Sequence, residues 1–291
     1  MRRKGGKTMQ AAGRHKLAKA MGFHIPALLL SVLMIYPLVW MLASSLKPNE
    51  EVFTTVTSLI PSRFVWDNYV TGWQSTGRYT YTTYFANSFK IALLSTIGGV
   101  ISSSLVAYAF ARIPFAGKKV WFAILMGTML LPVQVLLIPQ YIMFKTFGWI
   151  NTYLPIIVPQ FCGVPFFVFL NLQFMRGVPK ELDEAAEMDG CGWFYKYIRI
   201  MLPLSVPSLI TSGIFGFYWS WQEFLQPLIY ISKPRLYPVS IALKMFSDPN
   251  TQTNWSGLFA MTTLSIVPVV IVFMVFQRYL VEGVATTGLK G

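Results

Sequence analysis

The sequence predicts an all-α polytopic membrane protein with about six transmembrane helices. Of the 291 residues, 54% are hydrophobic and only 12% are charged, and the mean hydropathy is +0.52. These values lie outside the usual range of soluble globular chains. A bilayer core of about 30 Å is crossed by roughly 20 apolar residues in a helix, and uncharged stretches of that length recur along the chain.

A basic tail of residues 1–22 is expected to precede a transmembrane domain over residues 23–281, and residues 282–291 form a second tail. The six spans are expected at about 23–46, 91–111, 120–142, 154–175, 204–231 and 258–277. The first apolar stretch is longer than the apolar part of an ordinary signal peptide, and no small-residue cleavage site follows it before Lys47. We therefore expect it to be a retained helix.

The placement of basic residues predicts the orientation of the chain. With six spans both termini lie on one side, and that side carries 16 of the 24 Lys and Arg residues. Because short cytoplasmic segments of membrane proteins are enriched in Lys and Arg, we expect both termini and the connection 176–203 in the cytoplasm. The formal net charge of +13 then reflects topology, and nucleic acid is not an expected partner.

Prolines lie inside or at the edges of several spans, among them Pro37, Pro139, Pro207 and Pro268. Proline removes a backbone donor and kinks a helix, which a membrane tolerates where neighbouring helices or a watered cavity satisfy the freed carbonyl. Broken helices of this kind favour a transport path over a simple membrane anchor.

Residue types that catalysis and metal binding require are scarce. The cysteines and histidines of the chain are Cys162, Cys191, His15 and His24. Two cysteines and two scattered histidines predict neither a disulfide framework nor a metal cluster. The one Gly-Lys-Thr, at residues 6–8, has Met1 where a phosphate-binding loop needs its first glycine. We therefore expect no enzyme activity, metal or cofactor in this chain.

The connection between the fourth and fifth spans is unusually acidic. Five of the 11 acidic residues fall between Glu181 and Asp189, next to Pro179, which suits a first helical turn, and before Gly190, which suits a helix end. The helical spacing of Ala185, Ala186 and Asp189 predicts a shallow small-residue face. A second helical stretch is expected over residues 193–201. The connection is either an interfacial hairpin that joins two spans or a docking site for another protein.

The same connection resembles a known family signature. Glu184, Ala185 and Ala186, then Gly190, and then Ile200, Leu202 and Pro203 match every position of the EAA signature of permease subunits in bacterial ABC importers. The stretches 107–112, 221–225 and 276–280 resemble the MalG-like branch of carbohydrate importers, and the likeness covers roughly residues 20–291. Gln222 departs from the asparagine expected in many relatives.

The resemblance implies a type I ABC importer permease fold in the bacterial inner membrane. It implies that the helix around Glu184 lies in a cleft of a cytosolic ATPase subunit, which uses ATP and Mg, and that the tail 282–291 reaches the ATPase interface. The implied partners are a second homologous permease subunit, two ATPase copies and an extracytoplasmic solute-binding protein. The implied substrate is a sugar or oligosaccharide.

A substrate path is expected near the end of the fifth span. Glu223 is the one acidic residue placed inside a span, and such residues are functional candidates. It lies near Tyr218, Trp219, Trp221 and Gln222, and aromatic faces with amide and carboxylate groups suit sugars. A carboxyl hydrogen-bonded between helices for structural reasons is the alternative. Gln160, Asn171 and Gln173 are weaker candidates.

Two alternatives to a carbohydrate importer remain. One is an ABC importer for glycerol phosphate or another sugar-derived solute. The other is a self-sufficient secondary transporter, which would carry internal inverted repeats and ionisable residues at mid-membrane. The sequence does not determine which solute is carried or whether the permease pair is a homodimer or a heterodimer.

Overall fold

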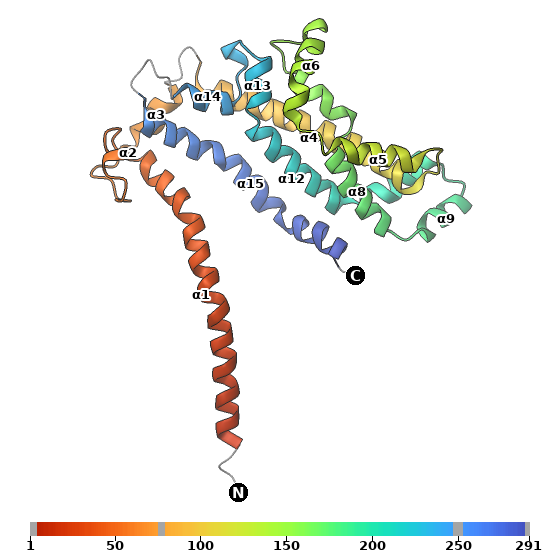
Figure 1. The fold of residues 1–291 in the computed structure, drawn as a ribbon, viewed down its shortest axis with the longest axis horizontal. Coiled ribbons are helices and arrows are strands. Elements are labelled where there is room, and N and C mark those ends of the chain that lie inside the picture. The colour runs from red at the N-terminus through yellow and green to blue at the C-terminus, as the bar shows by residue number, and fades with distance from the viewer. Residues whose placement is uncertain (1–4, 75–78, 247–252, 289–291) are drawn as a thin grey trace. The chain divides into compact units, whose positions relative to one another are not determined.

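A computed structural model of the chain describes residues 5–74, 79–246 and 253–288, and within these ranges every regular element is a helix (Figure 1). The chain divides into two compact units. One unit comprises Met1–Thr71 and Asn254–Thr263, and the other comprises Gly72–Thr253 and Leu264–Gly291. The predicted all-α membrane class is confirmed.

Among the described residues, four helical stretches are long and apolar enough to cross a membrane: Gly22–Ser45, Tyr81–Arg112, Leu154–Gly177 and Trp255–Leu280. Two bent helix pairs raise the number to six if each pair is one span. The first stretch belongs to α1 (Gly5–Ser45), and the last belongs to α15 (Trp255–Gly288).

The first unit contains α1, the short helix α2 (Glu51–Thr54), the start of α3 (Asp67–Gln74) and the start of α15. Lys47 is buried after α1, and its Nζ donates hydrogen bonds to the carbonyls of Thr55 and Ser58 at 2.8 and 2.6 Å. The Ser62 hydroxyl and amide donate to the Glu51 carboxylate and lower the pKa of that carboxyl. These bonds order the polar segment that follows α1.

The second unit is built around α4 (Tyr81–Arg112), which packs against α8 (Pro165–Gly177), η1 (Val158–Cys162) and α12 (Val206–Gln222) (Figure 1). Small residues permit this close packing, as is usual for membrane helices. A Cβ on Gly99 would lie 3.3 Å from Val164, and a Cβ on Gly98 would overlap the Phe161 ring. The helix α4 is longer than the expected span 91–111.

The fourth expected span is interrupted. Leu154–Ile157 forms α7, η1 follows, and α8 begins only after Gly163, which has a φ of +91°. The Ser103 hydroxyl accepts a hydrogen bond from the Val164 amide at 2.8 Å, and the Ser102 hydroxyl donates to the Gln160 carbonyl at 3.0 Å. Side chains of α4 thus satisfy backbone groups that the break leaves free.

The third expected span is bent. Lys118–Thr128 forms α5 and Val133–Thr146 forms α6, and the two helices meet at 97°. Pro132 stands at the N-cap of α6 in an extended conformation. Proline has no amide hydrogen for a helical hydrogen bond, and its ring disfavours the helical conformation in the residue before it, so α5 does not continue into α6. The expected span 120–142 therefore consists of two helices that meet at a bend.

The fifth expected span, 204–231, is also broken, near its end. The helix α12 ends at Gln222, and α13 (Leu225–Tyr230) is a separate helix. Pro227 explains the break, because proline has no amide hydrogen to bond the Glu223 carbonyl and its ring would clash with that carbonyl. The Ser240 hydroxyl donates to the Glu223 carbonyl instead, at 2.7 Å. The helices η3 (Pro234–Leu236) and α14 (Val239–Met245) follow.

Candidate functional site

The acidic connection contains the helix α9 (Glu181–Met188). Glu181, Asp183 and Glu184 lie in its first turn, where carboxylates complement the positive end of the helix dipole. Its end is a Schellman motif: the Gly190 amide donates to the Glu187 carbonyl at 3.0 Å, and the Cys191 amide donates to the Ala186 carbonyl at 2.9 Å. Gly190 has a φ of +76°, which glycine adopts without steric cost.

The exposed face of α9 differs from the expected small-residue face. Ala186 is 7% exposed and faces the protein, whereas Glu184 and Ala185 are exposed and Met188 is 86% exposed. Since residues four apart share a helix face, Glu184 and Met188 mark the outer surface. Ala186 therefore packs α9 against the rest of the protein. The surface available to a partner is that of Glu184, Ala185 and Met188.

The return segment after Gly190 consists of three short helices. The helix α10 covers Trp193–Lys196, the π-helical η2 covers Tyr197–Met201, and α11 covers Leu202–Leu204. Ile200 is half-buried in η2, Pro203 is exposed in α11, and Leu202 packs against a buried cluster that includes Leu172 of α8. The segment Trp193–Leu204 then meets α12 at an angle of 76°.

Polar contacts from α4 to this connection were not predicted from the sequence. The Arg112 Nε lies 2.9 Å from a carboxylate oxygen of Asp183 in α9, and its side chain is 5% exposed. The Arg112 guanidinium also donates to the Val178 carbonyl at 2.6 Å. Arg112 ends the motif 107–112, so a buried partner could have been suspected, but nothing local in the sequence identifies Asp183 as that partner.

A partly open cavity of about 300 Å³ lies where α12 ends, within the second unit. It is lined by residues of α4, α7, η1, α8, α12 and α13 and by residues between them: Ser95, Ile156, Gln160, Val164, Phe167, Gly216, Trp219, Ser220, Glu223 and Gln226. The Trp219 indole stacks on the Phe167 ring with centroids 5.4 Å apart and an interplanar angle of 8°. Two of the five predicted path residues, Trp219 and Glu223, thus line one cavity.

Glu223 has a structural role at this cavity. Its Oε1 accepts hydrogen bonds from the amides of Leu225 and Gln226 at 2.9 and 3.1 Å. These amides belong to the first turn of α13 and have no partner within that helix. The carboxylate therefore caps α13, which agrees with the structural alternative, while the same side chain lines the cavity.

Ser95 adds a polar group to the cavity wall. Its residue is 3% exposed, and its hydroxyl is buried without a hydrogen-bond partner in the described structure. Because buried polar groups are normally satisfied by protein or water, this hydroxyl is an unpaired polar group in the wall of the cavity.

The other predicted path residues lie elsewhere. Trp221 is 6% exposed, and its Nε1 donates to the Ser265 carbonyl at 2.9 Å, so it joins α12 to α15. Gln222 is exposed and lines neither cavity described here. Asn171 is buried and bonds Ser208 and Ser212 of α12 at 2.8 and 3.0 Å. Trp221 and Asn171 therefore hold helices together.

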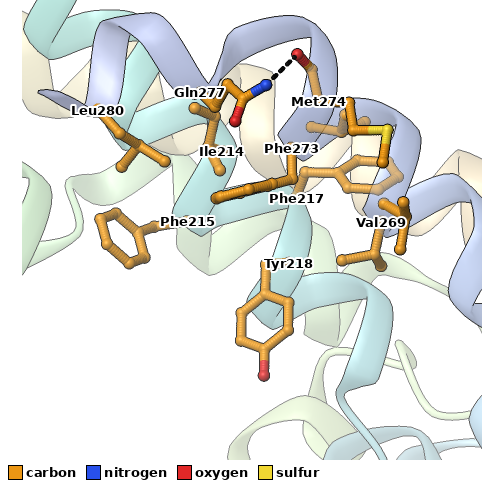
Figure 2. Close-up of a pocket in the computed structure, with 11 residues that line it drawn as sticks. Ile214, Phe215, Phe217, Tyr218, Val269, Phe273, Met274, Gln277 and Leu280 are labelled. Carbon is orange, nitrogen blue, oxygen red and sulfur yellow. Dashed lines mark hydrogen bonds between the residues drawn. The ribbon is translucent and has the colours of Figure 1, made fainter. Parts of the chain in front are cut away.

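Tyr218 lines a second pocket, of about 640 Å³, between α12 and α15. Figure 2 shows the Tyr218 ring extending away from the apolar side chains of Phe217, Phe273 and Met274, while Gln277 bonds the Met274 carbonyl of its own helix. The lining is almost entirely apolar. This chemistry suits lipid or a packed helix better than a hydroxyl-rich solute.

Metal-ligating residues do not gather in the described part of the chain. No group of three or more His, Cys, Asp or Glu side chains there is placed to hold a metal ion. Cys162 and Cys191 are free thiols. The tail 289–291 and the side chains of residues 1–21 and 281–291 lie outside what the structure describes, so the expected role of 282–291 stays a prediction.

The sequence matches a known protein family and several of its members. The sequence profile of the family described as "Binding-protein-dependent transport system inner membrane component" matches residues 99–286. The chain is 36% identical over 257 residues to the probable ABC transporter permease protein YurM of Bacillus subtilis, covering 88% of this chain and 84% of that protein. It is 32% identical to the arabinooligosaccharides transport system permease protein AraQ of Halalkalibacterium halodurans, covering 88% of this chain and 91% of that protein.

A solved structure shares the fold. A chain in the crystal structure of a bacterial ABC transporter involved in the import of the acidic polysaccharide alginate superposes with a TM-score of 0.78 at 19% identity, covering 91% of this chain and 98% of that one.

Proposed function

The chain belongs to the family of binding-protein-dependent transport system inner membrane components, and we propose that it forms half of the pore of an ATP-driven importer for a carbohydrate. A second, homologous permease subunit forms the other half. Two copies of a cytosolic ATPase subunit and an extracytoplasmic solute-binding protein complete the transporter. The chain itself carries out no catalysis, and ATP and Mg bind the ATPase.

The observation that carries this proposal is the surface of α9. A short helix with exposed Glu184, Ala185 and Met188 stands between two membrane-crossing stretches. An exposed apolar side chain beside a carboxylate is a surface that a partner can cover and neutralise. In this proposal α9 inserts into the ATPase, and Gly190, Ile200, Leu202 and Pro203 shape the segment that returns to the membrane.

The cavity supports a carbohydrate as the solute. The relative from Halalkalibacterium halodurans is named for arabinooligosaccharides. Trp219 offers an aromatic face for the C–H surface of a sugar ring, and Ser95, Gln160 and Gln226 offer hydroxyl and amide groups for its hydroxyls. These groups can donate hydrogen bonds to sugar hydroxyls and accept hydrogen bonds from them.

The charge of the cavity argues against glycerol phosphate, the second candidate. Glu223 is the one ionisable side chain among the described residues that line it. A carboxylate repels a phosphate in a site of low dielectric, so a neutral solute is favoured. Membership of the family also argues against a self-sufficient secondary transporter.

The proposal is tested by reversing charge on the outer surface of α9. Glu184→Lys should prevent the ATPase from co-purifying with the permease pair, because the complementary surface becomes repulsive. Glu50→Lys is the matched control, since Glu50 is also exposed and lies before α2. Normal ATPase binding and normal uptake by the Glu184→Lys complex would contradict the proposed docking surface.

A further inference from the structure

Three side chains on one face of α4 contact three parts of the connection 178–203. Ser104, Tyr108 and Arg112 follow one another at intervals of four residues, so they lie along one side of the helix. Each of them is almost fully buried. The described structure therefore attaches α4 to this connection at its beginning, middle and end.

Arg112 makes the first attachment. Its Nε is paired with the Asp183 carboxylate at 2.9 Å, and its guanidinium donates to the Val178 carbonyl at 2.6 Å. The Asp183 side chain is 14% exposed. The guanidinium thus contacts Asp183 as an ion pair and Val178 through a hydrogen bond, so α9 and the chain that leads into it are both held at the end of α4.

Tyr108 and Ser104 make the other attachments. The Tyr108 hydroxyl donates to the Trp193 carbonyl at 3.0 Å. The hydroxyls of Ser104 and Tyr197 share a hydrogen bond of 2.6 Å, and the rings of Tyr108 and Tyr197 have centroids 5.2 Å apart. The return segment α10–η2 is thus attached to the same face of α4 as α9.

The connection is also closed on itself. Lys196 in α10 is 2% exposed, and its Nζ lies 3.3 Å from the Glu187 carboxylate in α9. The same ammonium lies 4.0 Å from the centroid of the Trp193 ring. The ion pair joins α10 to α9, and the cation–π contact holds the Lys196 ammonium in place within α10. The helix α4 contacts both α9 and α10.

The opposite part of α4 reaches the cavity. Ser95 lines it, and the 18 residues from Ser95 to Arg112 span about 25 Å of continuous helix. The intervening helix packs against η1, α8 and α12, so it is supported over its length. A displacement of α9 is therefore passed to the cavity wall by a rigid rod.

We propose that Arg112 is a positioning residue, and that its pair with Asp183 makes α4 the element by which α9 moves the wall of the solute cavity. This inference rests on the proposed function. Tyr108 and Ser104 hold the return segment to the same rod. Without the ion pair α9 still meets the ATPase, but its displacement is taken up by the connection and no longer reaches Ser95.

The test is a coupling ratio measured in proteoliposomes that contain the permease pair, the ATPase and the solute-loaded binding protein. Arg112→Gln and Asp183→Asn should each lower the solute taken up per ATP hydrolysed by about tenfold, while the ATPase still co-purifies. The double variant should be no worse than either single variant, because the two residues act as one unit. Arg112→Lys should recover part of the ratio, since an ammonium restores the positive charge but not the planar set of N–H donors.

Arg176→Gln is the matched control. It removes the first arginine of the connection 176–203, whose guanidinium lies over the Phe122 ring at 5.5 Å, and it should leave the coupling ratio unchanged. An unchanged ratio in Arg112→Gln would overturn the inference, whether the complex is obtained in full or in reduced yield. If the ATPase fails to bind even the unaltered chain, the proposed function fails instead, so the two failures are distinct.

Discussion

At the scale of single residues, Gly190 determines where α9 ends. Its positive φ lets the Gly190 and Cys191 amides turn back onto the last carbonyls of the helix. A Cβ at this position would meet no atom within 4 Å, so any cost of substitution comes from the backbone alone. The end of α9 was predictable because glycine after a helical pattern is a local signal.

Gly190→Ala should loosen α9. The left-handed conformation costs an alanine about 1–2 kcal/mol, so the amides of residues 189–191 should exchange with deuterium about tenfold faster. Gly190→Asn should fall between the two, since asparagine tolerates this conformation better. Equal exchange in all three proteins, followed by mass spectrometry of the peptide 181–191, would show that the motif does not limit the stability of α9.

Glu223 illustrates what the sequence leaves open at residue scale. Its position in an apolar stretch marks it as unusual. The amides that donate hydrogen bonds to it belong to α13, a separate helix because Pro227 breaks the span. That consequence depends on three-dimensional structure. The sequence therefore identified the residue and did not decide between its structural and transport roles.

Glu223→Gln separates these roles. The glutamine carbonyl can still accept the two amide bonds, so folding and assembly should be kept, while the negative charge is removed from the cavity. If the carboxylate bonds the solute, uptake should fall about tenfold, because hydrogen bonds to charged groups are worth about 1.5–3 kcal/mol. Normal uptake by an intact complex would remove Glu223 from the solute path.

At the scale of helices, a polar cluster joins α8 to α12. Asn171 is fully buried, donates to Ser212 and to the Phe167 carbonyl, and accepts from Ser208. Hydrogen bonds of this kind stabilise helix pairs in a membrane, where hydrophobic association is weak. Asn171 stands out in the sequence as a polar residue in an apolar span, and only the packing of α8 on α12 reveals its partners.

Asn171→Ala should lower the stability of the permease in detergent. It removes three hydrogen bonds and leaves a small void, at a cost of about 1–3 kcal/mol. Thermal unfolding monitored by tryptophan fluorescence measures the loss. Thr128→Ala is the control, because Thr128 is exposed and bonds only its own helix in the contact described, at 2.6 Å to Leu125. Equal midpoints for Asn171→Ala and the control would contradict a stabilising role.

The helices themselves were predicted better than their breaks. Apolar length identifies the stretches that can cross a membrane, and the four long ones fall near the expected spans. The bend of 97° at Pro132 and the 76° angle before α12 depend on how neighbouring helices satisfy freed backbone groups. Composition along the chain does not specify those neighbours.

At the scale of the whole molecule, topology assigns each part to a side of the membrane. An even number of spans and the excess of Lys and Arg on one side predict that the termini and α9 share the cytoplasmic side. The connection that contains α9 then meets a cytosolic protein, and the opposite side meets the solute-binding protein. The proposed division of labour depends on this orientation.

Cys191 provides a direct test of the orientation. After Cys162→Ser, a membrane-impermeant thiol reagent should label Cys191, which is partly exposed, in inside-out vesicles that lack the ATPase. It should not label Cys191 in sealed right-side-out vesicles. Labelling from the outside of sealed vesicles would place α9 on the wrong side for the proposed coupling.

The central claim is that this chain transmits work from an ATPase to a carbohydrate path. Its most direct measurement is ATP hydrolysis by the permease pair reconstituted with its ATPase, with and without a sugar-loaded binding protein. The account predicts that the loaded binding protein stimulates hydrolysis and that Glu184→Lys abolishes this stimulation. Equal hydrolysis with and without the loaded binding protein, in a complex whose ATPase is bound, would contradict it.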